Sequence, residues 1–337
     1  MNDRAVSLFE QYDIEVVRTR KGSGSILCES KQGLFTLKEF TGSKEKAELM
    51  DTLLMQLQEK LPRDIRVEMV LKNKENELLT EDTDGTKYIV KSWFDGRECN
   101  VKDRMECEQV VALLAGLHNN MSLNEMADTE SGSPIDGLPV YSLEKEYERH
   151  TKELKRVRRF LKEKSQKTDF EIFLNRHFDF FMEQAKQVQE DYAHYAAMDS
   201  EQALREYGHW CHGDYQHHNI IVANSVTAVI NFDKLIIDYP VRDLYLFMRK
   251  LLEKSDWSCS LGERLLSVYE KVRPLSAQER ISLYYRFAYP EKFWKIVNFY
   301  YNSRKSWIPG KNMEKLENVL AQEKEKQQFL DEVLRKV

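Results

Sequence analysis

One short stretch of this sequence carries residues that could perform chemistry. His212-Gly213-Asp214 is followed after four residues by Asn219, and the apolar run Ile220-Ile221-Val222 begins directly behind it. A carboxylate in such a loop can orient or deprotonate a substrate hydroxyl, and a carboxamide oxygen five residues later can coordinate magnesium. Asp214 is therefore the candidate catalytic residue and Asn219 a candidate metal ligand. The pattern gains weight only if the chain also supplies the other parts of a phosphoryl-transfer site.

The first such part is a cation that could hold phosphate groups. Lys38 lies between apolar neighbours near the end of a strand-like run, although a solvent-exposed lysine at a sheet edge would look the same. An acid on the following helix could fix this lysine. Glu45 and Glu48 are both available, three residues apart and hence near one face of the helix. We favour Glu48 as the partner.

Two further segments could contact a nucleotide. The turn that contains Gly22 and Gly24 could bring backbone amides close to phosphates, and it could equally be a plain hairpin turn. The segment 90–96 runs from a strand into a glycine where the composition changes. Its Ser92 and Phe94 are candidates for the contact with an adenine edge, although aromatic side chains here could simply belong to the core.

A second metal ligand is expected behind the strand pair that follows the loop. In Val229-Ile230-Asn231-Phe232-Asp233, read as a strand, Asn231 and Asp233 would point to the same face because side chains alternate. Magnesium prefers hard oxygen ligands with at least one carboxylate. Asp233 is therefore the second predicted magnesium ligand, beside Asn219.

The predicted elements divide the chain into a sheet-rich part and a larger helical part. This α+β pattern predicts an N-terminal lobe over residues 1–95 and a C-terminal lobe over 96–337. Strands are expected at 14–18, 25–29, 34–40, 66–71 and 88–93, with helices at 2–12 and 43–60. Beyond residue 96, helices are expected at 102–118, 144–165, 170–197 and over most of the chain after Pro240, with a loop at 123–143. A strand pair at 220–222 and 227–232, joined by a turn at 224–225, interrupts them.

Composition excludes several classes of protein. The chain has 337 residues, of which 42% are hydrophobic and 32% charged, and its net charge is −5. These values are typical of a folded globular protein and give no indication of a nucleic-acid partner. The five cysteines form no Cys-x-x-Cys pair, which predicts reduced, mostly buried thiols rather than disulfides or zinc. The first residues carry no signal-peptide pattern and no run approaches a membrane span, so we expect synthesis in the cytoplasm and no membrane partner.

Taken together, these motifs resemble a known family. His212-Gly213-Asp214-x4-Asn219, Asn231-Phe232-Asp233 and Pro240-Val241-Arg242-Asp243-Leu244 are similar to motifs of the aminoglycoside and choline phosphotransferases, a protein-kinase-like superfamily. The segments 93–99, 288–294 and 300–309 make the chain more similar to the spore-coat protein S (CotS) group of that superfamily. The resemblance runs nearly end to end and implies a bilobal kinase-like fold.

The resemblance also implies roles for individual residues. Asp214 would orient or deprotonate the accepting hydroxyl, Asn219 would bind magnesium, and Lys38 would bind the phosphates of ATP. The sequence departs from the superfamily at Asn231, where an aspartate usually supplies the second metal ligand. Either Asp233 takes over this function, or metal binding is weak and the chain is a pseudokinase. Losing a carboxylate beside the ion removes a full charge from the metal site.

Two functions therefore remain open. The first is an ATP- and magnesium-dependent phosphotransferase acting on a hydroxyl of an unidentified small molecule or protein. The second is a weak or inactive kinase-fold component of the spore coat, with other coat proteins as partners. A hydrolase in which Cys211 and His212 act with Asp214 is disfavoured, because such groups normally converge from separate segments.

Overall fold

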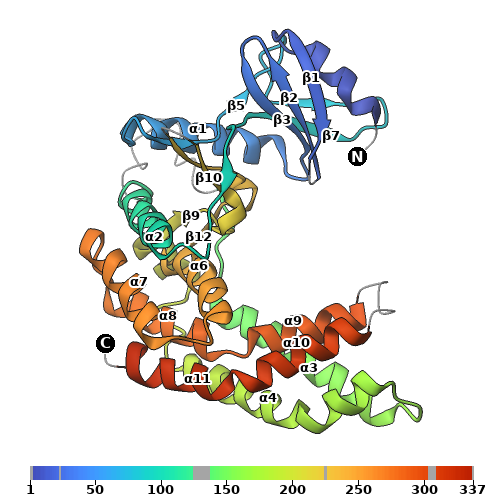
Figure 1. The fold of residues 1–337 in the computed structure, drawn as a ribbon, viewed down its shortest axis with the longest axis vertical. Helices are drawn as coiled ribbons and strands as arrows, with labels where there is room; N and C mark the ends of the chain where they lie inside the picture. Colours follow the sequence, from blue (N-terminus) through green and yellow to red (C-terminus); the bar gives the residue numbers. More distant parts are fainter. Residues whose placement is uncertain (1–2, 23, 124–136, 224–225, 303–308, 336–337) are drawn as a thin grey trace. The chain divides into compact units, whose positions relative to one another are not determined.

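The computed structural model describes residues 3–22, 24–123, 137–223, 226–302 and 309–335. The chain forms two compact units, the first made of Met1–Pro139 with Trp210–Ile236 and the second of Val140–His209 with Ile237–Val337 (Figure 1). The predicted turn at 224–225, most of the predicted loop at 123–143, and part of the segment 300–309 lie outside the described residues.

Unit 1 is built on an antiparallel sheet. Its strands are bonded in the order β1-β2-β3-β7-β5, with β6 also paired to β7. Their bounds are β1 Val16–Lys21, β2 Ser25–Ser30, β3 Gly33–Glu39, β5 Val70–Leu71, β6 Leu79–Glu81 and β7 Lys87–Ser92. Thr36 of β3 lies opposite Lys91 of β7, and Lys38 lies opposite Ile89. Because directly opposed residues share a face, this register makes Lys38 and Lys91 diagonal neighbours on one face.

The other face of this sheet is apolar. Leu37 of β3 and Val90 of β7 are opposed there and fully buried. The short 3₁₀ helix η1, Asp3–Gln11, contributes Leu8 and Phe9 to the same cluster. Alternation along β3 and β7 therefore places a hydrophobic core on one side of the sheet and the two lysines on the other.

A second, four-stranded sheet joins the early and late parts of unit 1. It has the order β4-β11-β10-β8, formed by Ile65–Val67, Thr227–Val229, Ile220–Val222 and Arg97–Glu98. The pairing of β4 with β11 is parallel, and that of β10 with β8 is antiparallel. These pairings group the segment 210–236 with the first 139 residues, which differs from the expected division at residue 95.

The predicted strand at 66–71 is two strands. The chain leaves one sheet and enters the other between β4 and β5, at Glu68 and Met69. The Glu68 N–H donates to the carbonyl of Val229 (3.1 Å), whereas the Met69 carbonyl accepts from the N–H of Ser92 (2.8 Å). Helix α1, Lys44–Lys60, supports the crossing because the Gln58 side chain bonds the backbone of β4. Glu68 is thereby held at the junction of the two sheets.

The remaining helix of unit 1 is α2, Arg104–Asn119. Asp103 caps its N-terminus by accepting from the backbone of Met105 and Glu106. Val110, Val111 and Leu114 form its buried stripe. The predicted helix at 102–118 is therefore confirmed. It begins at Arg104, directly after the cap residue Asp103.

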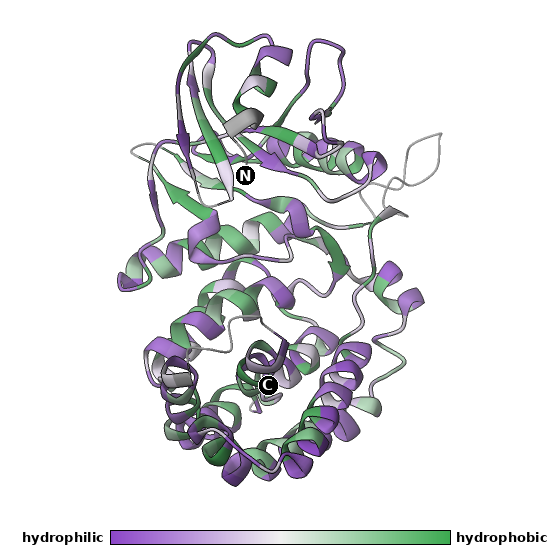
Figure 2. Cartoon of the chain, turned by 90° about the vertical axis from the view of Figure 1, so that its right-hand side faces the viewer, coloured by the Kyte–Doolittle hydropathy of each residue, from purple (hydrophilic) through white to green (hydrophobic). Residues whose placement is uncertain are grey.

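Unit 2 is almost entirely helical. Its helices are α3 Leu143–Glu163, α4 Asp169–Ala193, α5 Glu201–Tyr207, α6 Val241–Lys254, α7 Cys259–Val272, α8 Ala277–Ala288, α9 Glu291–Asn302, α10 Pro309–Ala321, α11 Glu323–Phe329 and the π-helical turn η6 Leu330–Leu334. Hydrophobic and hydrophilic residues alternate along these helices (Figure 2), as expected where one face is buried. The predicted capping box of Ser276 and Glu279 is confirmed, and Thr168 and Glu171 form another.

Two more short strands were not predicted from the sequence, β9 His209–Cys211 and β12 Ile236–Asp238. Asp238, the last residue of β12, is fully buried and accepts two hydrogen bonds from Arg286 of α8 (2.7 and 2.8 Å). In the part of the chain that the structure describes, no helix has the length and apolarity that crossing a bilayer requires. None of the five cysteines forms a disulfide, and all except Cys259 are buried.

A substitution at Gly96 tests whether the β10–β11 hairpin packs against the N-terminal part of unit 1. A Cβ at Gly96 would lie 2.6 Å from the Val222 carbonyl oxygen, whereas a Cβ at Gly116 within α2 meets no atom within 4 Å. We expect Gly96→Ala to lower the free energy of unfolding by about 1–3 kcal/mol. Gly116→Ala should raise it by about 0.5–1 kcal/mol because alanine favours helix. Urea titrations of both variants measure the free energy of unfolding. An unchanged free energy for Gly96→Ala would contradict the close approach of β8 and β10.

Candidate functional site

His212 ties the loop at 212–219 to the segment that follows β11. Its Nδ1 accepts from the backbone N–H of Asp214 (3.1 Å), and its Nε2–H donates to the carbonyl of Ile230 (3.0 Å). Both ring nitrogens are thus engaged by backbone groups. The ring is held as a structural bridge rather than as a base for Cys211, which argues against the hydrolase alternative.

The loop is also anchored to α2 and to its own hairpin. The Tyr215 hydroxyl donates to the carbonyl of Val110 (2.9 Å), and the Asn219 carbonyl accepts from the N–H of Ile230 (2.9 Å). Gly213 has a φ of +78°, and a Cβ there would lie only 2.0 Å from the Lys234 carbonyl oxygen. Only glycine fits both the backbone conformation and this contact.

Asp214 is a buried carboxylate with its own cation. Lys234 Nζ lies 2.8 Å from Oδ2, Gln216 Nε2 donates to Oδ1 (2.6 Å), and the Asn219 amide donates to the Asp214 backbone carbonyl (2.8 Å). Burial raises the pKa of Asp214, but the hydrogen bond and charge of Lys234 outweigh it and hold the pKa below its ordinary value. The group is therefore ionised at neutral pH, with both oxygens engaged.

The strand predicted at 227–232 ends at Val229. Asn231 has φ 71° and ψ 49°, in the left-handed region that asparagine tolerates better than most residues. Phe232–Lys234 then forms a 3₁₀ turn, and the buried Phe232 donates its N–H to Glu68 Oε1 (2.7 Å). The expectation that Asn231 and Asp233 share a strand face is therefore wrong, because this turn reorients both side chains.

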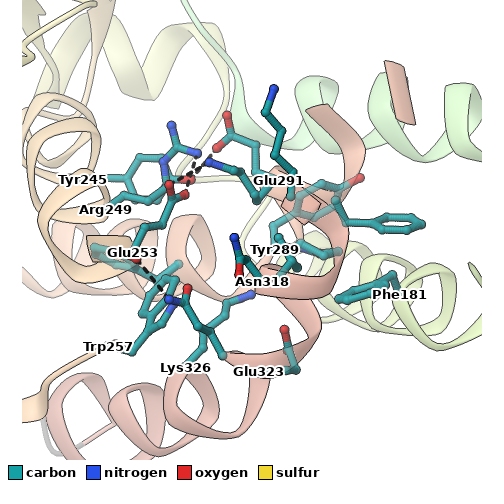
Figure 3. Close-up of a pocket in the computed structure, with 17 residues that line it drawn as sticks. Phe181, Tyr245, Arg249, Glu253, Trp257, Tyr289, Glu291, Asn318, Glu323 and Lys326 are labelled. Carbon is teal, nitrogen blue, oxygen red and sulfur yellow. Dashed lines mark hydrogen bonds and ion pairs between the residues drawn. The ribbon is translucent and has the colours of Figure 1, made fainter. Parts of the chain in front are cut away.

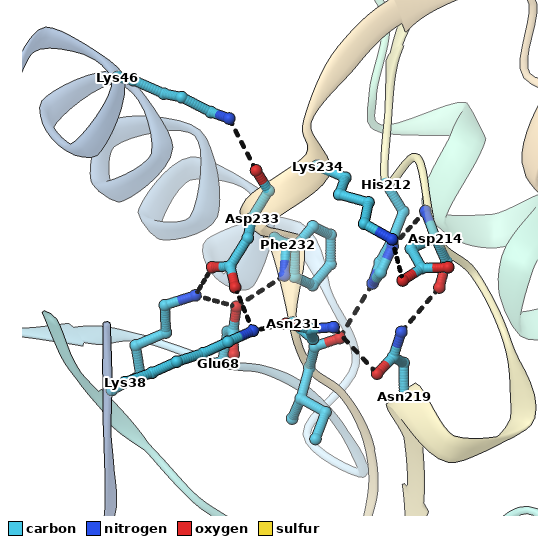
Figure 4. A network of polar contacts seen from close by, with 12 residues as sticks. Lys38, Lys46, Glu68, His212, Asp214, Asn219, Asn231, Phe232, Asp233 and Lys234 are labelled. Carbon is cyan, nitrogen blue, oxygen red and sulfur yellow. Dashed lines mark hydrogen bonds and ion pairs between the residues drawn. The ribbon is translucent and has the colours of Figure 1, made fainter. Parts of the chain in front are cut away.

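The carboxylate of Asp233 is paired with two lysines, of which Figure 4 labels Lys38. Its Oδ2 is 2.5 Å from Lys38 Nζ, and its Oδ1 forms an ion pair with Lys91, while Lys46 donates to its backbone carbonyl (2.7 Å). Lys91 is 1% exposed and is also paired with Glu68 (2.9 Å). Burial raises the pKa of Asp233, but Lys91 and Lys38 overcome this and hold it at about 2. Burial lowers the pKa of Lys91, yet Glu68 and Asp233 together raise it.

The structure brings four of the predicted site residues into one network. Lys38 donates to the Asn231 side-chain oxygen (2.6 Å) as well as to Asp233. The Asn231 amide donates to Asn219 Oδ1 (3.3 Å), and Asn219 bonds the backbone of Asp214. A continuous chain of contacts therefore runs from the lysine on β3 to the candidate catalytic aspartate.

The acid beside the lysines is neither of the two that the sequence predicted. Glu45 and Glu48 are exposed, and the described contacts of Lys38 go to Asn231 and Asp233 instead. Sequence reasoning missed both Glu68 and Lys91. The signal that could have found them is a charged residue inside an apolar strand-like run, in Val67-Glu68-Met69-Val70 and in Tyr88-Ile89-Val90-Lys91.

The predicted nucleotide-contacting residues have roles within the protein. The Gly22 N–H donates to the carbonyl of Ser25 (2.8 Å), and Gly24 adopts a φ of +72° at an exposed position. The Ser92 hydroxyl accepts from the N–H of Met69 (2.9 Å), and Phe94 packs against the cluster of Ile221, Ala228 and Ile230. Contact of these residues with a nucleotide stays a prediction.

The oxygen donors of this site do not fit a magnesium ion as they are arranged. Asn219 Oδ1 accepts from Asn231, Asn231 Oδ1 accepts from Lys38, and both carboxylate oxygens of Asp233 are paired with ammonium groups. Across the described ranges, no three or more His, Cys, Asp or Glu side chains gather in a way that could hold a metal. A divalent cation placed here would meet lysines where it needs carboxylates.

Comparison with known proteins identifies the family. A family model described as "Spore coat putative kinase YutH" matches residues 5–333. The chain belongs to this family. It is also 28% identical over 130 residues to spore coat protein S of Bacillus subtilis (strain 168), which covers 38% of the chain. The matched region spans only 37% of that relative's length.

Solved structures show the fold. An aminoglycoside phosphotransferase from Alicyclobacillus acidocaldarius aligns with a TM-score of 0.79 at 16% identity, covering 98% of this chain and 95% of that one. The spectinomycin phosphotransferase APH(9)-Ia, solved with ADP and spectinomycin, aligns with a TM-score of 0.63 at 13% identity, covering 94% and 96%. The predicted α+β, kinase-like phosphotransferase fold and the resemblance to the CotS group are thus confirmed.

The low pKa of Asp233 predicts how stability depends on pH. Its pKa is below the ordinary value of 3.8, so its contribution is complete above about pH 4 and is lost as the pH falls towards 2. This contribution is on the order of 2 kcal/mol. We expect Asp233→Asn to be less stable than the unsubstituted protein at pH 7, with the difference shrinking between pH 4 and pH 3.

Urea denaturation at these pH values measures the effect. Asp13→Asn, at an exposed position, controls for the change in net charge. A difference between the two proteins that stays constant from pH 7 to pH 3 would contradict the ion pairs of Asp233.

Proposed function

We propose that this protein is a nucleotide-binding pseudokinase of the spore coat, which holds a nucleoside triphosphate through its lysine cluster without a divalent metal. The observation that carries the proposal is the pairing of Asp233 with Lys38 and Lys91, next to a neutral Asn231. The aspartate that could have replaced the missing metal ligand already serves as a counter-ion. The family membership supports the coat as the location and other coat proteins as partners.

The charges of the cluster support phosphate binding. Four ammonium groups, of Lys38, Lys46, Lys91 and Lys234, lie among three carboxylates, of Glu68, Asp214 and Asp233. In magnesium-dependent phosphotransferases the ion neutralises the phosphate oxygens. Here an excess of ammonium groups could do the same as point charges. Lys38 and Lys234 are far more accessible than Lys91, with 35% and 64% of their side chains exposed against 2%.

Nucleotide titrations test this function. We expect ATP to bind with an affinity that changes by less than about threefold when MgCl₂ is replaced by EDTA, because both carboxylate oxygens of Asp233 are already paired with lysines. Lys38→Met should weaken binding by at least about tenfold through the loss of a charged hydrogen bond. Lys44→Met, which removes an exposed lysine paired with Glu77, is the matched control and should bind normally. Isothermal titration calorimetry measures all three, and binding that requires magnesium would overturn the proposal.

The second candidate function is an active phosphotransferase. It is favoured by the intact loop, in which Asp214 is a buried, ionised carboxylate and Asn219 lies next to it. Asp214 would then orient the hydroxyl of an acceptor and take its proton. The acceptor would be a small molecule or a protein that carries a hydroxyl group.

Asn231→Asp distinguishes the two candidates. For a pseudokinase, we expect no ATP turnover above background from the unsubstituted protein. The variant should gain magnesium-dependent ATP binding, because a carboxylate returns beside Asn219. For a phosphotransferase, the unsubstituted protein would already release ADP with magnesium, and Asp214→Ala would abolish this. A coupled assay of ADP release measures turnover, and calorimetry with and without magnesium measures binding.

A further inference from the structure

Unit 2 contains a cavity of about 310 Å³, large enough for a small ligand. It is lined by α6, the start of α9, and helices α10 and α11 (Figure 3). Every lining residue lies in unit 2, whereas the network of Lys38, Asp214 and Asp233 lies in unit 1. The cavity therefore requires its own explanation.

One side of the lining is aromatic. The rings of Trp257 and Phe287 meet edge to face, with centroids 6.0 Å apart, and Tyr245 meets Phe287 in the same manner at 5.0 Å. Phe181 and Tyr289 also line the space. Such rings offer a flat, apolar surface that can bury the body of a ligand.

Two deeply buried cations face the same space. Arg249 and Lys326 are each 7% exposed. The Arg249 Nε is buried without a hydrogen-bond partner among the described residues, and its Nη1 makes one long contact, 3.4 Å, with Glu253. Lys326 Nζ donates to the Ala288 carbonyl (3.2 Å) and lies 6.0 Å from the Trp257 ring centre. Its described contacts include no carboxylate within 4 Å.

Each acid around the cavity already has partners. Glu253 pairs with Lys292 (2.9 Å) and, at 3.4 Å, with Arg249. Glu291 pairs with Lys295 and the Tyr245 hydroxyl, and Glu323 accepts from the Gln184 amide (2.6 Å). In total, four cations and three carboxylates line the space. Burial lowers the pKa of Lys326, and the charges of Glu323, Glu253 and Glu291 offset this only in part. A buried ammonium group without a close counter-ion costs free energy, which a bound anion would recover.

We propose that this cavity binds a small monoanionic carboxylate with an apolar or aromatic body. Its carboxylate would lie against Arg249 and Lys326, and its body would pack against Trp257 and Phe287. The single excess positive charge of the lining matches one negative charge, and a guanidinium group suits a planar carboxylate. The proposal concerns binding alone and does not depend on the function proposed for unit 1.

Pairs of isosteric probes test the class of ligand. Benzoate, phenylacetate and hexanoate are compared with their neutral primary amides by ligand-observed NMR and calorimetry on the full chain. We expect at least one carboxylate to bind with an affinity at least about tenfold above that of its amide. This ratio corresponds to the free energy of one charged hydrogen bond. No binding by any of the three carboxylates, or equal binding of the amides, would overturn the proposal.

Three variants locate the binding. Lys326→Met should weaken carboxylate binding by about tenfold or more, and Val319→Phe, which fills the space from α10, should abolish it. Lys324→Met, on the same helix but exposed and outside this lining, should bind as the unsubstituted protein does. Carboxylate binding unaffected by both Lys326→Met and Val319→Phe would place the ligand elsewhere and overturn the proposal.

Thermal unfolding separates a ligand-binding lysine from a structural one. Removing a buried ammonium that has no close carboxylate should leave the melting temperature of Lys326→Met unchanged or raise it. A large drop in melting temperature together with unchanged carboxylate affinity would show that Lys326 serves the fold instead.

Discussion

The buried ammonium group of Lys91 is the constraint on which unit 1 depends. Taking such a charge out of water costs several kcal/mol unless carboxylates surround it. Glu68 and Asp233 meet this need from two distant parts of the chain. The parallel pairing of β4 with β11 brings those parts together, so that the crossing at Glu68 and the turn at Asp233 lie on either side of the same lysine. The two sheets of unit 1 are thus joined by the chain that crosses between them at Glu68 and Met69 and by one buried ion cluster.

This arrangement bears directly on chemistry. A carboxylate that is already paired with two lysines coordinates a divalent ion poorly. The neutral Asn231 and the paired Asp233 therefore act in the same direction, away from metal binding. The loop of Asp214, in contrast, is held firmly by backbone contacts of His212 and Tyr215 and by the close-packed Gly213.

The two units contain buried lysines in opposite electrostatic settings. Lys91 has two carboxylates, and its pKa is raised despite burial. Lys326 has a backbone carbonyl and a nearby indole ring, and burial lowers its pKa. The same side chain at similar depth is stabilised by the protein in the first case and left partly uncompensated in the second. A buried charge that is only partly compensated is typical of a ligand-binding site, because buried charges that serve the fold alone are normally paired.

Local patterns in the sequence determined much of this protein. They predicted most strands of the antiparallel sheet, the main helices with the cap at Ser276, and the candidate residues Lys38, Asp214 and Asn219, because alternation, helical period and motif spacing are short-range properties. The kinase-like fold followed from the family resemblance of the motifs. Only the tertiary structure decided that Glu68 rather than Glu48 lies in the lysine cluster, and that Lys91 shares a face with Lys38. These outcomes depend on sheet register and on contacts between residues more than a hundred positions apart, such as Lys91 with Asp233. The left-handed backbone of Asn231 was likewise settled by the packing of Phe232 and its bond to Glu68, which no local pattern encodes.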